Sequence, residues 1–474
     1  MPNLLDLDAT ETARLIREGV ITSIDATNRF IAHLQSMNLH VNCLSGERFE
    51  EARRDAAAAD EQVQTGRPTG RLHGVPISVK DCFHIAGMAT TAGLPYRKGI
   101  IEETDADVVA MLKREGAVIL GKTNTPALCF CQETDNKLHG RTNNPWNLER
   151  TAGGSSGGEG ALIAAGGAAV GIGADIGGSI RFPSHCNGII GFKSGNKKVS
   201  AAGNYPFVSI AEQDRMLGIG AMAKSVRDAR LMNEIISSAA PAHAELGQFK
   251  LMIPGRQPGL PLGKETEAVL SRLRAELGQH FEVHEEMPPH FKPSALVWQQ
   301  IMSIDGAKHV RQLISEHGNL KPMNEYVKDR FSGGSDVHPY LTWALIGAGL
   351  FKPSPKRVAE IGALLQQGDQ ELDAYFQDRI TVLPVYHCSA PVHGRLYKEL
   401  FSIQKTYLKY IPYVAYANVW GLPSLVVPVA EDKEGLPIGV QLVSRPGNEE
   451  ALFQLGELLE QKYRGYKRCE KYDQ

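Results

Sequence analysis

The sequence has little of what marks nucleic-acid-binding, membrane-spanning or secreted proteins. Its 474 residues carry 51 basic and 53 acidic side chains, a net charge of −2, so no basic surface is expected to bind nucleic acid or anionic lipid. The longest uncharged apolar stretch, residues 160–174, is too short and too rich in glycine to span a bilayer. The first residues lack a basic segment followed by an apolar one, so no signal peptide is predicted.

Cysteine is also scarce. There are seven cysteines, an odd number, scattered between Cys43 and Cys469, and this pattern favours no disulfide framework. Cys129 and Cys131 stand too close together for a Cys-x-x-Cys redox or zinc pair. A reduced compartment fits these features best, so we expect a cytoplasmic protein.

What the sequence does contain is an alternation of amphipathic and short apolar segments. Residues 1–65 predict helices, one of them capped by Thr22 and Ser23. Buried strands are predicted at the end of residues 70–80 and at 117–120, with a helix at 105–114 between them. Residues 421–429 and 435–443 predict two paired strands, and 449–462 an amphipathic helix. Strand–helix alternation of this kind predicts an α/β fold.

Glycine is concentrated in one region, where 11 of the 26 residues from Gly153 to Gly178 are glycine. The apolar runs at 161–165 and 168–172 predict a packed helix and strand there rather than a flexible linker. Ser155 and Ser179 lie in glycine-dense loops, where backbone N–H groups can approach a reacting atom closely. Lys80 ends an apolar run, and burial of a lysine disfavours its charged form and makes it a base. Together these residues predict a serine acyl-transfer enzyme without a histidine base.

Two other motifs match known patterns but lie in the wrong context. Gly116-Ala-Val-Ile-Leu-Gly-Lys-Thr123 fits the phosphate-loop expression, yet its apolar residues predict a strand where a phosphate cradle needs a loop. Gly153-Gly-Ser-Ser-Gly157 fits the nucleophile-elbow pattern, which needs a preceding hydrophobic strand. We predict no such strand at residues 147–151.

The histidines give no clear catalytic or metal site. His280 and His284 have the spacing of two zinc ligands on a helix, but their alternating segment predicts a strand, on which they would lie about 13 Å apart. We therefore expect no metal. Other histidines near the motifs are expected to be surface or core residues; they are His73, His84, His185, His387 and His393.

One region of this sequence resembles the defining stretch of the amidase signature family of serine hydrolases. It runs from Gly153-Gly-Ser-Ser-Gly-Gly158 to Asp175-Ile-Gly-Gly-Ser-Ile-Arg181. The two serines are 24 positions apart (179 minus 155), which matches the family's spacing. The resemblance extends over most of the chain, at residues 75–81, 121–126, 144–147 and 435–441. Residues 158–160 and 179–183 are most similar to fatty acid amide hydrolases, and 338–343 and 389–393 to the second vertebrate type of that enzyme.

The resemblance implies a single α/β/α domain over residues 1–474, with a large mixed β-sheet covered by helices. We expect N-terminal helices at 1–65, a signature core at 66–205 and a variable helical region that shapes the substrate pocket at 206–400. Residues 401–474 would add strands and a helix to the same core.

The resemblance also implies a Ser-Ser-Lys triad that hydrolyses a linear amide through an acyl-enzyme, with esters or carbamates as further substrates. Ser179 would be the nucleophile, Ser155 the proton relay, and Lys80 the base. The peptide bond of Ser155 would be cis. If Asp81 points inward, its carboxylate would oppose loss of the positive charge of Lys80. The backbone N–H groups of Ile176, Gly177, Gly178 and Ser179 would form the oxyanion hole. Asp175 and Arg181 would support the loop as a buried ion pair.

Cys129 and Phe130 fall where acyl-chain contacts lie in fatty acid amide hydrolases, so they predict an acyl pocket, with ordinary core packing as the alternative. Residues 341–351 could extend this pocket or touch a membrane surface. No cofactor is expected, and the expected partner is a small-molecule amide, with a homodimer left open. Two alternatives for the whole chain are the amidase component of a tRNA-dependent amidotransferase and a non-catalytic binding protein on the same fold.

Overall fold

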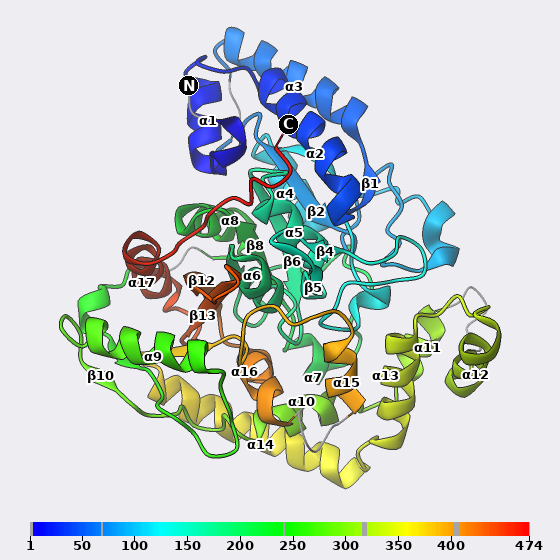
Figure 1. Ribbon diagram of the computed structural model, residues 1–474, viewed down its shortest axis with the longest axis vertical. Helices are drawn as coiled ribbons and strands as arrows, with labels where there is room; N and C mark the ends of the chain where they lie inside the picture. The colour runs from blue at the N-terminus through cyan, green and yellow to red at the C-terminus, as the bar shows by residue number, and fades with distance from the viewer. Residues whose placement is uncertain (1–2, 68–69, 240–241, 315–319, 402–407, 474) are drawn as a thin grey trace.

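The computed structural model describes residues 3–67, 70–239, 242–314, 320–401 and 408–473. Met1 and Pro2 of the predicted N-terminal segment and residues 402–407 of the predicted C-terminal one lie outside them. An eleven-stranded sheet runs through the middle of the molecule (Figure 1). Its strands, in order across the sheet, are β1 (Leu44–Glu47), β3 (Val118–Thr123), β2 (Pro76–Lys80), β6 (Val170–Asp175), β8 (Gly218–Ala223), β7 (Ile190–Lys193), β12 (Ser424–Glu431), β13 (Pro437–Val443), β11 (Arg379–Pro384), β9 (Lys250–Met252) and β10 (Val283–His284).

The sheet is mixed. β2 runs parallel to both β3 and β6, whereas β8 is antiparallel to β6 and β7, and β12 is antiparallel to β7 and β13. A separate two-stranded sheet joins β4 (Asn143–Asn144) to β5 (Asn147–Thr151). The predicted α/β fold with one large mixed sheet is confirmed.

Helices cover the sheet on both sides. They are α1 (Ala9–Arg17), α2 (Ser23–Val41), α3 (Phe49–Gln64), α4 (Asp107–Arg114), α5 (Gly157–Ala164), α6 (Arg181–Asn187), α7 (Ala211–Asp214), α8 (Val226–Ile236), α9 (Lys264–Leu277), α10 (Ser294–Met302), α11 (Lys308–Leu313), α12 (Pro322–Ser332), α13 (Pro339–Leu350), α14 (Pro355–Tyr375), α15 (Arg395–Phe401), α16 (Leu408–Val419) and α17 (Glu449–Lys462). No helix in the described ranges is both long and apolar enough to cross a membrane.

β12 shows how two layers of helices pack on the sheet. Leu425 belongs to the core cluster that includes Leu452 and Leu455 of α17, whereas the next residue, Val426, packs with Phe182 of α6. Successive side chains of a strand point to opposite faces, so α17 and α6 cover opposite faces of the sheet.

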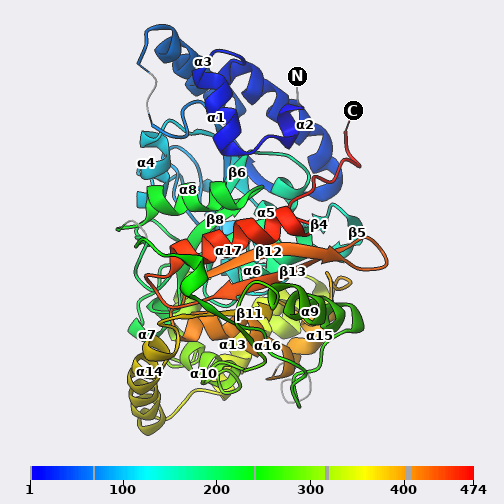
Figure 2. The same ribbon diagram turned by 90° about the vertical axis from the view of Figure 1, so that its left-hand side faces the viewer.

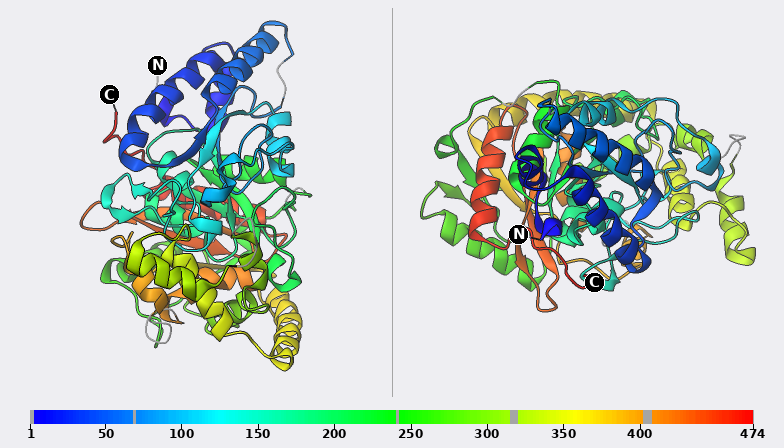
Figure 3. Two further views of the ribbon diagram at one scale, coloured as in Figure 1. Left: turned by 90° about the vertical axis from the view of Figure 1, so that its right-hand side faces the viewer. Right: turned by 90° about the horizontal axis from the view of Figure 1, so that it is seen from above.

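The ends of the molecule are built from different parts of the chain. In Figures 1 and 2, α1–α3 gather at one end, beside both chain termini, and α10, α14 and α16 lie at the other. The two views in Figure 3 show the same grouping of the N-terminal helices and the C-terminal tail. Both terminal segments are tied to the core: Lys224 Nζ donates to Leu5 O at 2.7 Å, and Cys469 N to Ala164 O at 2.8 Å.

Most predicted elements are present. Thr22 is the N-cap of α2, where its hydroxyl accepts the N–H of Asp25, and α17 has the predicted bounds of 449–462. Residues 147–151 form a short strand, β5, but it is polar, partly exposed and outside the main sheet, so it is not the hydrophobic strand that a nucleophile elbow needs. One prediction is wrong in extent. The strand expected over 280–284 is limited to β10, Val283–His284.

The parallel pairing of β2 with β6 determines where chemistry can occur. Val79 lies opposite Ile172 in register, so Lys80 at the end of β2 and Asp175 at the end of β6 reach the same edge of the sheet. Crevices beyond the carboxyl ends of strands are the usual ligand sites of open α/β sheets.

Candidate active site

Lys80 is the last residue of β2 and has no exposed surface. Its Nζ donates to Ser155 Oγ at 2.7 Å and to Ala174 O at 3.3 Å. The lysine is therefore buried, as its apolar run predicts, and its amino group is in contact with one of the two predicted serines.

Ser155 lies in the loop that precedes α5. The peptide bond between Gly154 and Ser155 is cis, as the resemblance implies. The Ser155 carbonyl accepts the Thr125 hydroxyl at 2.9 Å, and a Cβ atom added to Gly154 would lie 2.7 Å from Cys131 O. Glycine at position 154 therefore allows the neighbouring loop, residues 131–133, to pack directly on the backbone beside Ser155.

Ser179 stands in the loop between β6 and α6. Its carbonyl accepts the N–H of Ser156 at 3.0 Å, which joins this loop to the one that carries Ser155. Lys80, Ser155 and Ser179 all line one cavity of about 460 Å³. The structure thus brings together the lysine singled out by its apolar run and the two serines singled out by their glycine-rich loops.

A buried ion pair anchors the Ser179 loop. Arg181 Nε donates to Asp175 Oδ2 at 3.0 Å, and neither side chain is exposed. Burial alone would raise the pKa of Asp175, but the Arg181 charge and its hydrogen bonds outweigh burial and hold that pKa well below its usual range. The carboxylate also accepts the N–H groups of Gly178 at 2.7 Å and Ile180 at 3.1 Å. Asp175 and Arg181 form a buried ion pair bonded to this loop, and their role as loop supports stays a prediction.

The backbone amides of residues 176–179 differ in their hydrogen bonds. The N–H of Gly178 is bound to Asp175, whereas those of Ile176, Gly177 and Ser179 make no hydrogen bond to another described residue. Two neighbouring carbonyls are held from outside the loop, Gly177 O by Gln132 Nε2 at 3.0 Å and Gly178 O by Phe182 N at 2.7 Å.

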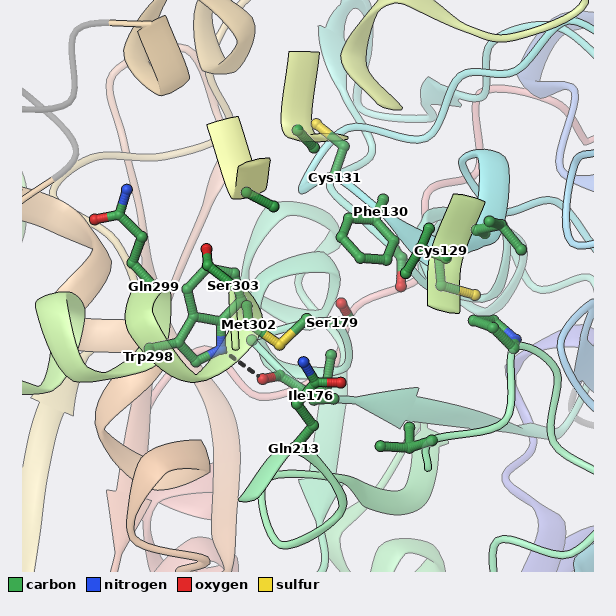
Figure 4. A pocket seen from close by; sticks show the side chains of 18 of the residues that line it. Cys129, Phe130, Cys131, Ile176, Ser179, Gln213, Trp298, Gln299, Met302 and Ser303 are labelled. Atoms are coloured by element: carbon green, nitrogen blue, oxygen red, sulfur yellow. Dashed lines mark hydrogen bonds between the residues drawn. The ribbon is translucent and has the colours of Figure 1, made fainter. Parts of the chain in front are cut away.

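The cavity is mostly apolar (Figure 4). Cys129 and Phe130, predicted as acyl-chain contacts, lie on its wall, and so do Trp343 and Ile346 of α13, within the segment expected to extend the pocket. The hydrogen bond from Cys82, against the effect of burial, lowers the pKa of the Cys129 thiol below its usual value.

The lysine of the phosphate-loop match has a structural role. Lys122 lies within β3, as the apolar pattern predicts, and its Nζ is 3.5 Å from Asp81 Oδ1. Burial lowers the pKa of Lys122, and the Asp81 charge opposes that shift. Asp81 also accepts the N–H of Thr91 at 3.1 Å, so its carboxylate is engaged away from the Lys80–Ser155 contact.

The histidines considered from the sequence lie away from the cavity, and of the described histidines only His309 lines it. His185 is one of the core histidines, since its ring is fully buried and contacts Cys388 O at 2.9 Å. Burial lowers the pKa of His185, which keeps the ring neutral in the core.

Four residues of the site were missed in the sequence. Gln132 and Trp298 hold the carbonyls of the Ser179 loop, and Asn418 Nδ2 donates to Asp175 Oδ1 at 2.9 Å. Gln441 accepts Arg181 Nη1 at 2.9 Å. Asn418 and Gln441 had a usable signal, because each is a lone polar residue in an apolar run that forms a buried helix or strand.

Comparisons with known proteins give the family and the fold of the chain. The family model described as Amidase matches residues 25–453. The chain is 33% identical over 492 residues to fatty-acid amide hydrolase 2-B of Danio rerio, covering 98% of this chain and 90% of that protein. It is 30% identical over 483 residues to a glutamyl-tRNA(Gln) amidotransferase subunit of Roseiflexus sp. (strain RS-1), covering 96% of each. The solved structure of 6-aminohexanoate cyclic dimer hydrolase complexed with substrate has the same fold, with a TM-score of 0.82 at 24% identity over 98% of this chain and 99% of that one.

Proposed function

Because the chain belongs to the amidase signature family of amide-hydrolysing enzymes, we propose that it cleaves a linear amide with an apolar acyl group through a covalent intermediate on Ser179. In this proposal Ser155 relays the proton and Lys80 is the base. The observation that carries it is the buried 2.7 Å contact between Lys80 Nζ and Ser155 Oγ on the wall of the cavity that Ser179 also lines.

The proposed first step forms a bond between Ser179 Oγ and the amide carbon. The Ser179 proton passes to Ser155 Oγ, and the Ser155 proton passes to the unprotonated amine of Lys80. The carbonyl oxygen becomes an oxyanion, which the N–H groups of Ile176, Gly177 and Ser179 would stabilise. Gly178 is left out because its N–H donates to Asp175.

Collapse of the oxyanion breaks the C–N bond. Ser155 returns the proton to the departing nitrogen, which leaves as a neutral amine or ammonia rather than as an unstable anion. Water then attacks the acyl group on Ser179 by the same relay, which releases a carboxylic acid. Each proton taken up by Lys80 is returned in the same half-reaction, so these steps need no cofactor.

The acyl group is inferred from the cavity. Its wall is formed largely by apolar side chains, among them Leu128, Phe130, Phe207, Met302, Ile346 and Ile411. Burial of each additional CH₂ group of a substrate contributes about 0.8 kcal/mol, so longer acyl chains should bind more tightly until the cavity is filled. Fatty and aryl acyl amides are therefore the proposed substrates, with the corresponding esters and carbamates as further ones.

A substrate series tests this function. The purified chain is assayed alone on the primary amides of acetic, octanoic, hexadecanoic and phenylacetic acids, and Ser179→Ala is the control. We expect kcat/KM to rise with the size of the apolar acyl group and turnover by Ser179→Ala to fall about 10⁵–10⁶-fold. Undiminished activity of Ser179→Ala, or no preference for larger acyl groups, would contradict the proposal.

The similarity to an amidotransferase subunit over nearly the whole chain supports a second candidate function, release of ammonia for a partner protein. Turnover of fatty acyl amides by the isolated chain argues against this candidate. Labelling of Ser179 by a fluorophosphonate, lost in Ser179→Ala, argues against a non-catalytic binding protein.

A further inference from the structure

Trp298 lies between the apolar cavity and the loop that carries Ser179. It belongs to α10, and its indole ring is part of the cavity wall. Its Nε1 donates to Ile176 O at 2.8 Å, the contact drawn as a dashed line in Figure 4. This hydrogen bond joins residues 122 positions apart in the sequence.

The indole ring also packs against the next residue of the loop. A Cβ atom added to Gly177 would lie 2.7 Å from Cζ2 and 3.2 Å from Nε1 of Trp298. The ring therefore contacts the carbonyl oxygen of Ile176 by a hydrogen bond and the adjoining Cα of Gly177 by van der Waals packing, both on the same side of the peptide group that joins these residues.

The orientation of this peptide group determines where the Gly177 N–H points. The carbonyl of Ile176 and the N–H of Gly177 belong to one planar trans peptide and point in opposite directions. Two glycines follow in sequence, and glycine places few steric limits on rotation of the adjoining peptide groups. A bond that holds the carbonyl against α10 therefore directs the N–H away from the indole ring.

The next peptide group is held separately. Gln132 holds the carbonyl of Gly177, and Asp175 accepts the N–H of Gly178. Two successive peptide groups that precede Ser179 are therefore restrained. Trp298 restrains the one between Ile176 and Gly177, and Gln132 and Asp175 restrain the next one.

We propose that Trp298 is a positioning residue that keeps the Gly177 N–H aimed at the oxyanion. The inference rests on the proposed function, because it needs an oxyanion that forms at Ser179. Complete loss of an oxyanion donor typically lowers kcat about 10²–10³-fold. Loss of the bond that orients such a donor should have a smaller effect, about 10–100-fold, because the N–H itself remains.

The test is Trp298→Phe, which removes the indole N–H and keeps an aromatic ring on the cavity wall. We expect kcat to fall about 10–100-fold while KM changes less than about threefold. A trifluoromethyl ketone, which forms an oxyanion on Ser179, should lose affinity by about the same factor as kcat/KM. The methyl ketone with the same alkyl chain, which stays largely uncharged, should bind almost as well as to the unchanged enzyme.

Trp146→Phe is the matched control. Trp146 Nε1 donates to Asn187 O at 2.8 Å, so the control removes a hydrogen bond of the same kind and length outside the cavity lining. We expect its kcat to match that of the unchanged enzyme. If Trp298→Phe does not fold, benzothienylalanine at position 298, which replaces the N–H by sulfur within a ring of nearly the same shape, gives the decisive measurement.

The outcomes separate this inference from the proposed function. An unchanged kcat, or equal losses of affinity for the two ketones, would overturn the role of Trp298 while leaving the hydrolase assignment intact. Failure of the unchanged enzyme to hydrolyse acyl amides, or full activity of Ser179→Ala, would instead overturn the proposed function.

Discussion

Glu159 is a carboxyl group buried close to the candidate site that the proposed reaction does not use. It lies on α5 with no exposed surface and accepts the hydroxyls of Ser78 at 2.6 Å and Thr123 at 3.0 Å. A Cβ atom added to Gly171 would lie 2.1 Å from Glu159 Oε2, so the carboxyl group packs on the backbone of β6. Burial raises the pKa of Glu159 from 4.5 to about 7, against the two hydroxyl hydrogen bonds.

This pKa predicts how stability varies with pH. A carboxyl group whose pKa is higher in the folded state binds its proton more tightly there, so its stabilising contribution is complete below pH 4.5 and is lost as the pH rises through about 7. The side chain in Glu159→Gln has nearly the same shape as that of glutamate but cannot ionise. We therefore expect the free energy of unfolding of the variant, relative to the unchanged enzyme, to increase by about 3 kcal/mol from mildly acidic to neutral pH. Urea denaturation at a series of pH values measures this difference, and a difference that does not vary with pH would contradict the prediction.

At the scale of single residues, the sequence predicted those that share a local motif and missed those that reach the site from elsewhere. Lys80, Ser155 and Ser179 stand out because glycine-rich or apolar neighbours surround them in the chain. The apolar run around Asn418 marks it as a buried polar residue but not as a partner of this loop, and Trp298 gave no local signal, because their partners lie 243 and 122 residues away. Contacts over such separations depend on the packing of the whole sheet, which a residue's own neighbours do not specify.

Among the elements, α14 contains two glycines in opposite environments. Gly362 is exposed, and a Cβ atom added there would meet no atom within 4 Å. Gly368 is buried, and a Cβ atom there would lie 2.3 Å from Cζ3 of Trp420. The two positions have the same helical backbone, so replacement by alanine brings the same gain in helix propensity at both. The two substitutions differ only in whether the added methyl group has room.

Alanine substitution at these positions should change stability in opposite directions. Gly362→Ala should raise the free energy of unfolding by about 0.5–1 kcal/mol, because glycine in a helix loses more backbone entropy on folding than alanine. Gly368→Ala should lower it by about 1–3 kcal/mol, because the indole ring of Trp420 has to move. Denaturant midpoints of the two variants measure both effects, and shifts of the same sign would contradict the packing described for α14.

Helices and strands with a clear hydrophobic pattern in the sequence were predicted well, whereas the shortest strands were predicted poorly. The amphipathic pattern of 449–462 gives α17 with its observed bounds, and the apolar run that ends at Lys80 gives β2. β9 and β10 have three and two residues, too few for any periodicity to show. β8, which begins Gly218-Ile-Gly, has glycine where strands usually carry branched side chains.

For the whole molecule, the main difference from the sequence prediction concerns residues 206–400. They were expected to be largely helical, yet they also supply β8, β9, β10 and β11 to the main sheet. β8 lies between β6 and β7, two strands that precede it in the chain. The predicted signature core, residues 66–205, therefore has a gap in its own sheet that a later part of the chain fills.

This topology predicts that residues 1–205 do not fold alone. Without the later residues, β7 loses both neighbours, β8 and β12, and β6 loses its pairing with β8. The buried Arg181 guanidinium also loses three acceptors, namely Gln441, the Val414 carbonyl and Asn418. Unpaired strand edges favour pairing with other chains, and the buried guanidinium, which would keep Asp175 but lose these three acceptors, would be left with unsatisfied N–H groups that destabilise the folded state.

We expect fragment 1–205 to show no cooperative unfolding transition and no labelling of Ser179 by a fluorophosphonate. Co-expression with 206–474 is the control and should restore both, because the second fragment supplies β8 and β12 and the partners of Arg181. Circular dichroism during heating and in-gel detection of the label give the two measurements. If the fragment melts cooperatively and is labelled without its partner, the prediction is contradicted. The strands from residues 206–474 would then be additions to a core that folds by itself, and the division of the sheet between the two halves of the chain would have no bearing on folding.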